Sequence, residues 1–315
     1  MPAPALVFLF WCAALGAEDP LPSWRDGANK AAILAFVEAV STRGSPMYVP
    51  PTARLAAFDA DGTLWPERPH YLPVLFALHR LRSLAPAHPE WDQLQPFAKA
   101  LHRGADAELS FDEMMQLQQV AFGASTPEQF AAWVEAWLHQ PHPSLGRSYA
   151  SLAYAPMLEL VAYLRQHGFV VALDSGAEAE FVRGVSRILY AMPPYWVVGN
   201  HLQMVYEARP NATTLRRLSR WQDPFNGGAG KVINLVGALG CSPIFAVGNA
   251  DNDLELLQYT ARRPGPHFTM LLQHDDAARE FKYTVETTRI RAMAARQDTH
   301  LVSMQADFAT IFLPP

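Results

Sequence analysis

The feature that most constrains this chain is a short apolar strand that ends in two carboxylates. Residues 55–58 are continuously apolar, and residues 59–63 read Asp-Ala-Asp-Gly-Thr. Continuous apolar runs are typical of strands that are buried on both faces of a parallel sheet. Because side chains two apart point to the same side of a strand, we expect Asp59 and Asp61 to lie together at its carboxyl end. Ligands of open parallel sheets bind at that edge, whereas a plain surface turn would lack the buried strand in front.

Apolar strands and glycine-terminated helices recur along the chain. Further strands are predicted at residues 169–173, 243–247 and 267–272. Helices are predicted at residues 25–40, 156–167, 177–190 and 231–239. Helices that end at glycine and lead into apolar strands indicate repeated helix–strand units. The sequence therefore predicts an α/β fold with a Rossmann-like parallel sheet wrapped by helices.

Residues 60–174 are too many for one crossover between strands, since a strand–helix–strand unit needs only about 30 residues or slightly more. This segment has helix start signals of its own. Residues 110–113 form a capping box, and residues 126–128 place a threonine cap before proline. We therefore predict an inserted all-helical cap. The predicted domains are the cap, residues 66–150, and an α/β core, residues 18–65 and 151–315.

The N-terminus begins with an apolar run, residues 5–17, that is followed at once by Glu18 and Asp19. The run is too short to span a bilayer as a helix, but it fits the apolar part of a secretory signal. We predict that residues 1–17 are a signal peptide and that the protein is exported to the periplasm. No Lys or Arg precedes the run, so a cytoplasmic protein that keeps this segment is the alternative. No other stretch predicts stable membrane insertion.

Charge and cysteine content exclude some classes of function. A net charge of -5 and a pI near 6.1 give no basic surface for nucleic acid. Removal of the signal peptide would remove Cys12 and leave Cys241, and a single thiol cannot form an internal disulfide. No histidine lies near Cys241 in the sequence, so a catalytic thiol is not expected.

Two segments could bind an anion. Ser175 and Gly176 follow the strand at 169–173, just before the next predicted helix, where a hydroxyl and free N–H groups suit phosphate. Lys231 follows Gly230 at the start of another helix, without the spacing of a nucleotide-binding P-loop. Each signal is weak alone, because Ser-Gly is a frequent turn and an isolated lysine is more often a solvated surface charge.

A fourth segment could bind a cation. Residues 248–253 follow the strand at 243–247 and read Gly-Asn-Ala-Asp-Asn-Asp. Carboxylate and amide oxygens suit a hard divalent cation such as Mg²⁺. Asn249 and Asp253 are therefore candidate ligands. The competing interpretation is an ordinary helix start with acidic residues in its first turn.

In this order and context, the four segments resemble the four motifs of the haloacid dehalogenase (HAD) superfamily. Residues 59–63 closely match its Asp-x-Asp-Gly-Thr motif, Ser175 and Lys231 match the second and third motifs, and residues 248–253 resemble Gly-Asp-x-x-x-Asp. Asn249 replaces the usual carboxylate of the last motif, and Asp174 stands where an apolar strand residue is expected. Four stretches are also similar to exported bacterial proteins of the phosphoserine-phosphatase-like branch: residues 19–24, 58–65, 84–91 and 248–254.

The resemblance implies a Mg²⁺-dependent phosphatase that acts on a small phosphorylated metabolite. Asp59 would be the nucleophile that forms an aspartyl-phosphate, and Asp61 the general acid and base. Phosphate would be bound by Ser175, Gly176 and Lys231. The Mg²⁺ ligands would be Asp59, Asp61, Asn249 and Asp253. Two alternatives stay open: a protein that binds a phosphorylated ligand with little or no turnover, favoured by Asn249, and a phosphotransferase.

The substrate is expected to be recognised by the cap. Its aromatic residues could line a pocket, although aromatic residues on bundle helices more often belong to the core. The candidates are Trp65, Tyr71, Phe76, Trp133 and Trp137.

Overall fold

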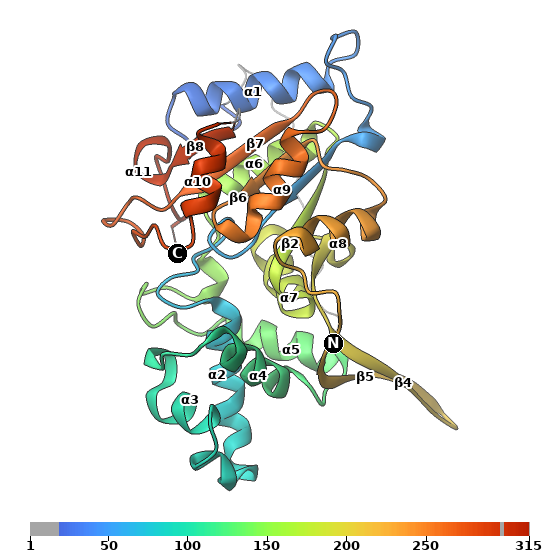
Figure 1. Ribbon diagram of the computed structural model, residues 1–315, viewed down its shortest axis with the longest axis vertical. Coiled ribbons are helices and arrows are strands. Elements are labelled where there is room, and N and C mark those ends of the chain that lie inside the picture. Colours follow the sequence, from blue (N-terminus) through green and yellow to red (C-terminus); the bar gives the residue numbers. More distant parts are fainter. Residues whose placement is uncertain (1–18, 297–298, 315) are drawn as a thin grey trace, which may run out of the picture.

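A computed structural model describes residues 19–296 and 299–314 of the 315-residue chain (Figure 1). The predicted signal peptide, residues 1–17, lies outside the described residues. Within the described part of the chain, no helix combines the length and the apolar character that crossing a membrane requires.

Six parallel strands form the central sheet, in the order β3-β2-β1-β6-β7-β8. β1 lies near the middle and pairs with β2 on one side and with β6 on the other. The strand order therefore reverses next to β1, which is where open α/β sheets bind ligands. The predicted α/β class with a parallel, Rossmann-like sheet is confirmed. The strands are β1 (Leu55–Phe58), β2 (Val170–Glu178), β3 (Val197–Asn200), β6 (Phe245–Gly248), β7 (Phe268–Gln273) and β8 (Thr299–Ser303).

Helices cover both faces of the sheet, and alternate residues of each strand pack on opposite faces. In β1, Ala56 and Phe58 join the core beneath α1, α6 and α7, whereas Leu55 and Ala57 join the core beneath α8, α9 and α10. This period of two explains why the strand is apolar at every position. The helices of this part are α1 (Ala28–Ser41), α6 (Ala155–Gln166), α7 (Ala179–Tyr190), α8 (Ala229–Leu239), α9 (Leu254–Ala261), α10 (Thr288–Ala294) and α11 (Met304–Asp307).

The segment from α2 to α5, which lies between β1 and α6, is helical and lies below the sheet in Figure 1. The predicted capping box at Ser110 and the predicted N-cap at Thr126 both form: the Ser110 side chain accepts from the Glu113 N–H, and the Thr126 side chain accepts from the Gln129 N–H. Phe76 of this segment stacks on Phe181 of α7, so the segment shares its apolar core with a helix of the sheet domain. The helices are α2 (Leu72–Leu84), α3 (Phe97–Arg103), α4 (Phe111–Phe122) and α5 (Pro127–Leu138).

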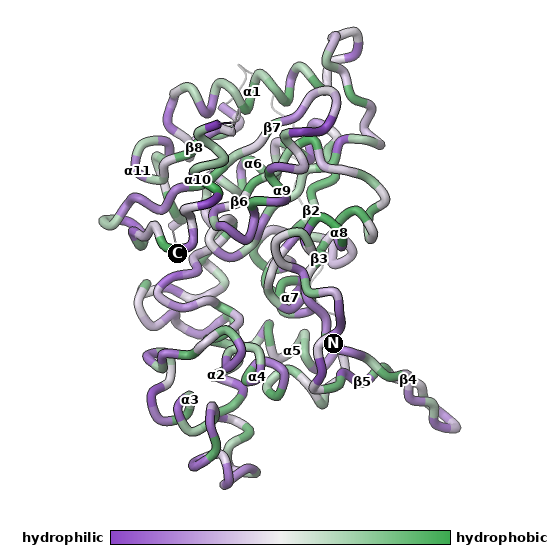
Figure 2. Tube along the Cα trace, in the orientation of Figure 1, coloured by the Kyte–Doolittle hydropathy of each residue, from purple (hydrophilic) through white to green (hydrophobic). Residues whose placement is uncertain are grey.

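An antiparallel hairpin that the sequence did not predict joins these helices. It consists of β4 (Leu202–Arg209) and β5 (Ala212–Trp221). The Arg217 N–H donates to the Ser125 carbonyl, and the Trp221 indole donates to the Met115 carbonyl. The hairpin therefore packs on α4 and the start of α5, although its residues lie within the range 151–315 assigned to the core. Its tip projects from the molecule and is hydrophilic (Figure 2).

Candidate active site

The carboxyl ends of β1, β2 and β6 open into a cavity of about 660 Å³. The strand ends contribute one side of the cavity, and the opposite side comes from α2, α4 and the end of β5. The structure brings six of the seven predicted site residues to this wall: Asp59, Asp61, Ser175, Gly176, Asn249 and Asp253.

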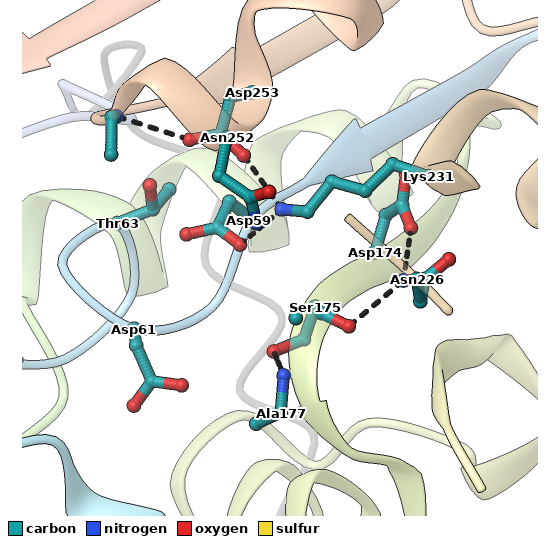
Figure 3. A network of polar contacts seen from close by, with 12 residues as sticks. Asp59, Asp61, Thr63, Asp174, Ser175, Ala177, Asn226, Lys231, Asn252 and Asp253 are labelled. Atoms are coloured by element: carbon teal, nitrogen blue, oxygen red, sulfur yellow. Dashed lines mark hydrogen bonds and ion pairs between the residues drawn. The ribbon is translucent and has the colours of Figure 1, made fainter. Parts of the chain in front are cut away.

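The seventh, Lys231, lies directly behind the wall and joins two carboxylates (Figure 3). Its Nζ lies 2.6 Å from Asp59 Oδ1 and 2.6 Å from Asp253 Oδ1, and its side chain is fully buried. A charge removed from water is tolerated only when it is paired and hydrogen-bonded. Lys231 is therefore part of the site and not the solvated surface charge that it resembles in isolation.

Both carboxylate oxygens of Asp253 accept hydrogen bonds. Its Oδ1 accepts from Lys231, while its Oδ2 accepts from the backbone N–H groups of Asn249 and Ala250 at 3.0 and 3.1 Å. Gly248 makes this turn possible, because a Cβ at that position would lie 2.5 Å from the Asp253 Cβ. The contacts of Asp253 therefore fit a residue that positions Lys231 and the turn after β6.

Asp59 carries a carboxylate in a site that is short of positive charge. Burial raises the pKa of Asp59, and the charge of Asp253 adds to this shift, whereas Lys231 opposes it. An additional cation beside Asp59 would favour its ionised form.

Asp61 lies in the loop after β1, away from the Lys231 cluster (Figure 3). Its Oδ1 accepts a 2.9 Å hydrogen bond from the Trp65 indole. Burial raises the pKa of Asp61 to about 6, and the hydrogen bond from Trp65 opposes the shift. A carboxyl group that titrates near neutral pH can both give and take a proton.

Ser175 and Gly176 reach the cavity from an extended segment. The prediction that a helix begins immediately after them is wrong: β2 continues to Glu178, and α7 begins at Ala179. The extension is held because Asn200 Nδ2 donates to the Gly176 carbonyl. The α7 N-cap is Glu178, whose side chain accepts from the Phe181 N–H.

Asp174, for which the sequence offered no role, anchors the end of β2. It is fully buried, and its Oδ1 accepts a 2.9 Å hydrogen bond from Asn226 Nδ2. The same Asn226 nitrogen donates to the Ser175 carbonyl at 2.8 Å. Asn226 therefore ties the Ser175 loop to the segment that leads into α8. Sequence reasoning missed it, since an asparagine before a Gly-Gly pair reads as an ordinary turn residue.

Glu67 is a second residue that the sequence analysis missed. It is buried, and its Oε1 accepts a 3.1 Å hydrogen bond from Asn249 Nδ2, while Asn249 Oδ1 accepts from the Thr63 hydroxyl at 3.0 Å. Burial raises the pKa of Glu67 to about 8, and the charges of Asp59 and Asp61 add to the shift. The sequence feature that could have identified Glu67 is its position as a third acid in the loop that carries the two aspartates.

The loop after β1 is packed too tightly for a side chain at Gly62. Gly62 has a φ of 77°, and a Cβ there would lie 2.2 Å from Asn249 Nδ2 and 2.7 Å from Glu67 Cδ. Glycine at this position therefore lets Asn249 and Glu67 approach the turn that carries Asp61.

The donor groups at the cavity fit a hard divalent cation in chemistry and in charge. Asp59 offers a carboxylate and Asn249 an amide oxygen, and a cation bound there would favour the ionised form of the neighbouring Glu67. Mg²⁺ is commonly held by one or two protein carboxylates with water and phosphate completing its shell. The described residues contain no group of three or more His, Cys, Asp or Glu side chains arranged to hold a metal by themselves.

Most of the predicted aromatic candidates belong to the core. Trp65, Phe76 and Trp137 are buried, and Trp133 packs under the guanidinium of Arg80. Of these candidates, Tyr71 lines the cavity. Two further aromatic residues of the cavity wall come from the end of β5 and the loop after it: Trp221 and Phe225.

The fold and the site define a parallel α/β protein with a buried lysine–carboxylate cluster at the carboxyl edge of its sheet. The haloacid dehalogenase-like hydrolases match residues 56–258, more than half of the chain, and the chain belongs to this family.

No curated protein is similar enough in sequence to count as a relative. Among solved structures, a protein of unknown function from Bordetella pertussis Tohama I is 16% identical, with a TM-score of 0.51, over 79% of this chain and 98% of that one. A conserved protein of unknown function from Anaerococcus prevotii DSM 20548 is 12% identical, with a TM-score of 0.58, over 90% of this chain and 94% of that one. These two similarities extend to the fold alone.

Proposed function

We propose that this protein is a Mg²⁺-dependent phosphatase that hydrolyses a small phosphomonoester through an aspartyl-phosphate on Asp59. The observation that carries the proposal is the buried ion pair between Lys231 and Asp59 at the base of a cavity. A fixed cation beside a carboxylate suits phosphoryl transfer, which depends mainly on positioning and on charge stabilisation.

In the first half of the reaction, a carboxylate oxygen of Asp59 forms a bond to phosphorus as the bond to the alcohol oxygen breaks. Asp61 gives its proton to the departing alcohol oxygen. In the second half, a water oxygen attacks phosphorus and passes a proton to Asp61, which releases phosphate and restores the Asp59 carboxylate. One carboxyl group can serve as acid and then as base because its pKa is raised to about 6.

The phosphoryl oxygens would be held by Lys231, the Ser175 hydroxyl and the Gly176 backbone. The side chains of Asp59 and Asn249 and the backbone oxygen of Asp61 would hold Mg²⁺. Bound there, Mg²⁺ would reduce the repulsion between the Asp59 carboxylate and the phosphate dianion. We assign Asp253 to the positioning of Lys231, since both of its oxygens are already hydrogen-bonded.

The test is hydrolysis of 4-nitrophenyl phosphate by the purified protein, with and without Mg²⁺. Activity should require the divalent cation, and Asp59→Asn should abolish it. Ser144→Ala, outside the residues that line the cavity, is a suitable control and should leave activity unchanged. Absence of turnover with every divalent cation tried would favour a protein that only binds a phosphorylated ligand. Transfer to an added alcohol would show a phosphotransferase.

A further inference from the structure

The cavity wall opposite the strand ends indicates which alcohol the protein accepts. We propose that the substrate is a phosphomonoester whose alcohol part has an apolar body and carries no negative charge. This inference rests on the proposed phosphatase function and names the substrate class of the same site.

The wall is apolar and is assembled from three separate segments of the chain. Trp221 packs edge-on to Phe225, and Phe225 packs edge-on to Phe111 at the start of α4. The Trp221 indole also donates a hydrogen bond to the Met115 carbonyl, so its polar atom is satisfied and the ring is fixed. An apolar body would lose contact with water against this surface, which favours its binding. The side chains that form this wall are Val74, Phe111, Met114, Met115, Trp221 and Phe225.

Acidic side chains outnumber basic side chains around the cavity. Among the described residues that line it, eight are acidic and one, Arg289, is basic. Arg289 is largely exposed and pairs with Glu255 at 3.1 Å, so the one basic side chain of the lining lies beside an acid.

Three basic side chains outside the lining each form an ion pair with an acid of the lining. Lys231 is shared between Asp59 and Asp253, and it is assigned to the phosphate end of the site. Arg217 is buried against Glu178 at 2.9 Å. Arg68 pairs with Glu286 at 3.3 Å.

A negative charge on the alcohol would therefore meet an apolar wall and more acidic than basic side chains, and no basic side chain lies on that wall. Selectivity of this kind comes from an unpaired charge in the wrong substrate. A neutral alcohol avoids the cost of removing water from an unpaired charge. A positively charged amine would be attracted by the surrounding carboxylates.

Three substrates of equal chain length test the proposal: propyl phosphate, 3-aminopropyl phosphate and 3-phosphooxypropanoate. With the unmodified protein and Mg²⁺, kcat/KM for the carboxylate substrate should be at least about tenfold below that for propyl phosphate, as expected for an uncompensated like charge. The value of kcat/KM for the amine substrate should equal or exceed that for propyl phosphate. Equal kcat/KM for the carboxylate and propyl substrates would overturn the proposal.

A charge introduced into the wall gives a second measurement. Met114→Lys places a cation at the cavity and should raise the ratio of kcat/KM for the carboxylate substrate over that for propyl phosphate. Ile233→Lys is a suitable control, since Ile233 is exposed on α8 and does not line this cavity, and the ratio should not change. An unchanged ratio in active Met114→Lys would count against the proposal.

Hydrolysis of 4-nitrophenyl phosphate separates the two levels of inference. If this substrate is cleaved while the carboxylate and propyl substrates are treated alike, the substrate class is wrong and the phosphatase function stands. If none of the phosphate esters is cleaved, the proposed function itself fails.

Discussion

The ammonium group of Lys231 lies 2.6 Å from the carboxylate of Asp59, although 172 positions separate the two residues in the chain. The contact is possible because α8, which carries Lys231, packs on β2 and β3, and its first turn brings Lys231 to Asp59 after β1 and to Asp253 after β6. Removal of either residue would leave the charge of the other unpaired in the protein interior, which is energetically costly.

The first prediction concerns the stability that this pair maintains. Lys231→Gln should lower the free energy of unfolding by about 3–5 kcal/mol, as breaking a buried ion pair usually does. Urea denaturation of the parent and the variant measures the difference.

The matched control is Lys99→Gln, which removes a partly exposed pair with Glu113 and should change stability little. A Lys231→Gln protein that resists urea as well as its parent would show that Asp59 and Asp253 do not depend on the ammonium group.

The second prediction separates the two aspartates of the first loop. Asp61→Asn removes the proton donor, so kcat on propyl phosphate should fall by about 10²–10⁴-fold. With 4-nitrophenyl phosphate, the rate of phosphoenzyme formation should fall much less, because nitrophenolate leaves without a proton. Rapid mixing should show a burst of nitrophenolate close to the enzyme concentration. Similar mild losses in Asp59→Asn and Asp61→Asn would contradict the assigned roles.

The position of the two aspartates could be predicted because the evidence is local. Residues 55–58 are apolar at every position, which predicts a buried strand, and the ends of such strands meet at one edge of the sheet. The helix N-caps at Ser110 and Thr126 were predictable for the same reason, since each involves residues only three apart.

Contacts between distant segments could not be predicted in this way. The motif resemblance indicates a role for Lys231, but its segment alone does not indicate that the side chain is buried between Asp59 and Asp253. Asn226 similarly acquires its role from the buried Asp174. The β4–β5 hairpin was missed because most of its residues are at least partly exposed, so its strands lack a clear apolar pattern.

The third prediction concerns Glu67, which lies beside the asparagine that replaces the usual carboxylate. A bound cation favours the ionised form of Glu67. Glu67→Gln keeps the shape of the side chain but cannot ionise, so Mg²⁺ affinity should fall by about 10–100-fold, as for other groups that support metal ligands. Isothermal titration calorimetry with Mg²⁺ measures this without any turnover.

Two further variants make that measurement specific to Glu67. Glu286→Gln changes a more exposed acid at the same cavity and should leave Mg²⁺ affinity unchanged. Asn249→Asp in the Glu67→Gln background returns one negative charge to the site and should restore much of the affinity. Unaltered Mg²⁺ binding by Glu67→Gln would exclude a contribution from this carboxylate.

The fourth prediction concerns the pH dependence of stability and follows from Asp174. Burial raises the pKa of Asp174 from 3.8 to about 7. The folded protein therefore retains this proton at pH values where the unfolded chain has lost it. Stability due to protonated Asp174 is fully present below about pH 4 and is lost as the pH rises towards 7.

Asp174→Asn removes this dependence, because the amide oxygen can still accept the hydrogen bond from Asn226 and cannot ionise. The difference in melting temperature between Asp174→Asn and the parent should therefore shift in favour of the variant from about pH 4 to pH 7 and then level off. Thermal unfolding followed by circular dichroism across this range measures the difference. A difference in melting temperature that stays constant with pH would contradict a protonated Asp174. It would mean that Asp174 is ionised in the folded protein and lies beside a positively charged partner.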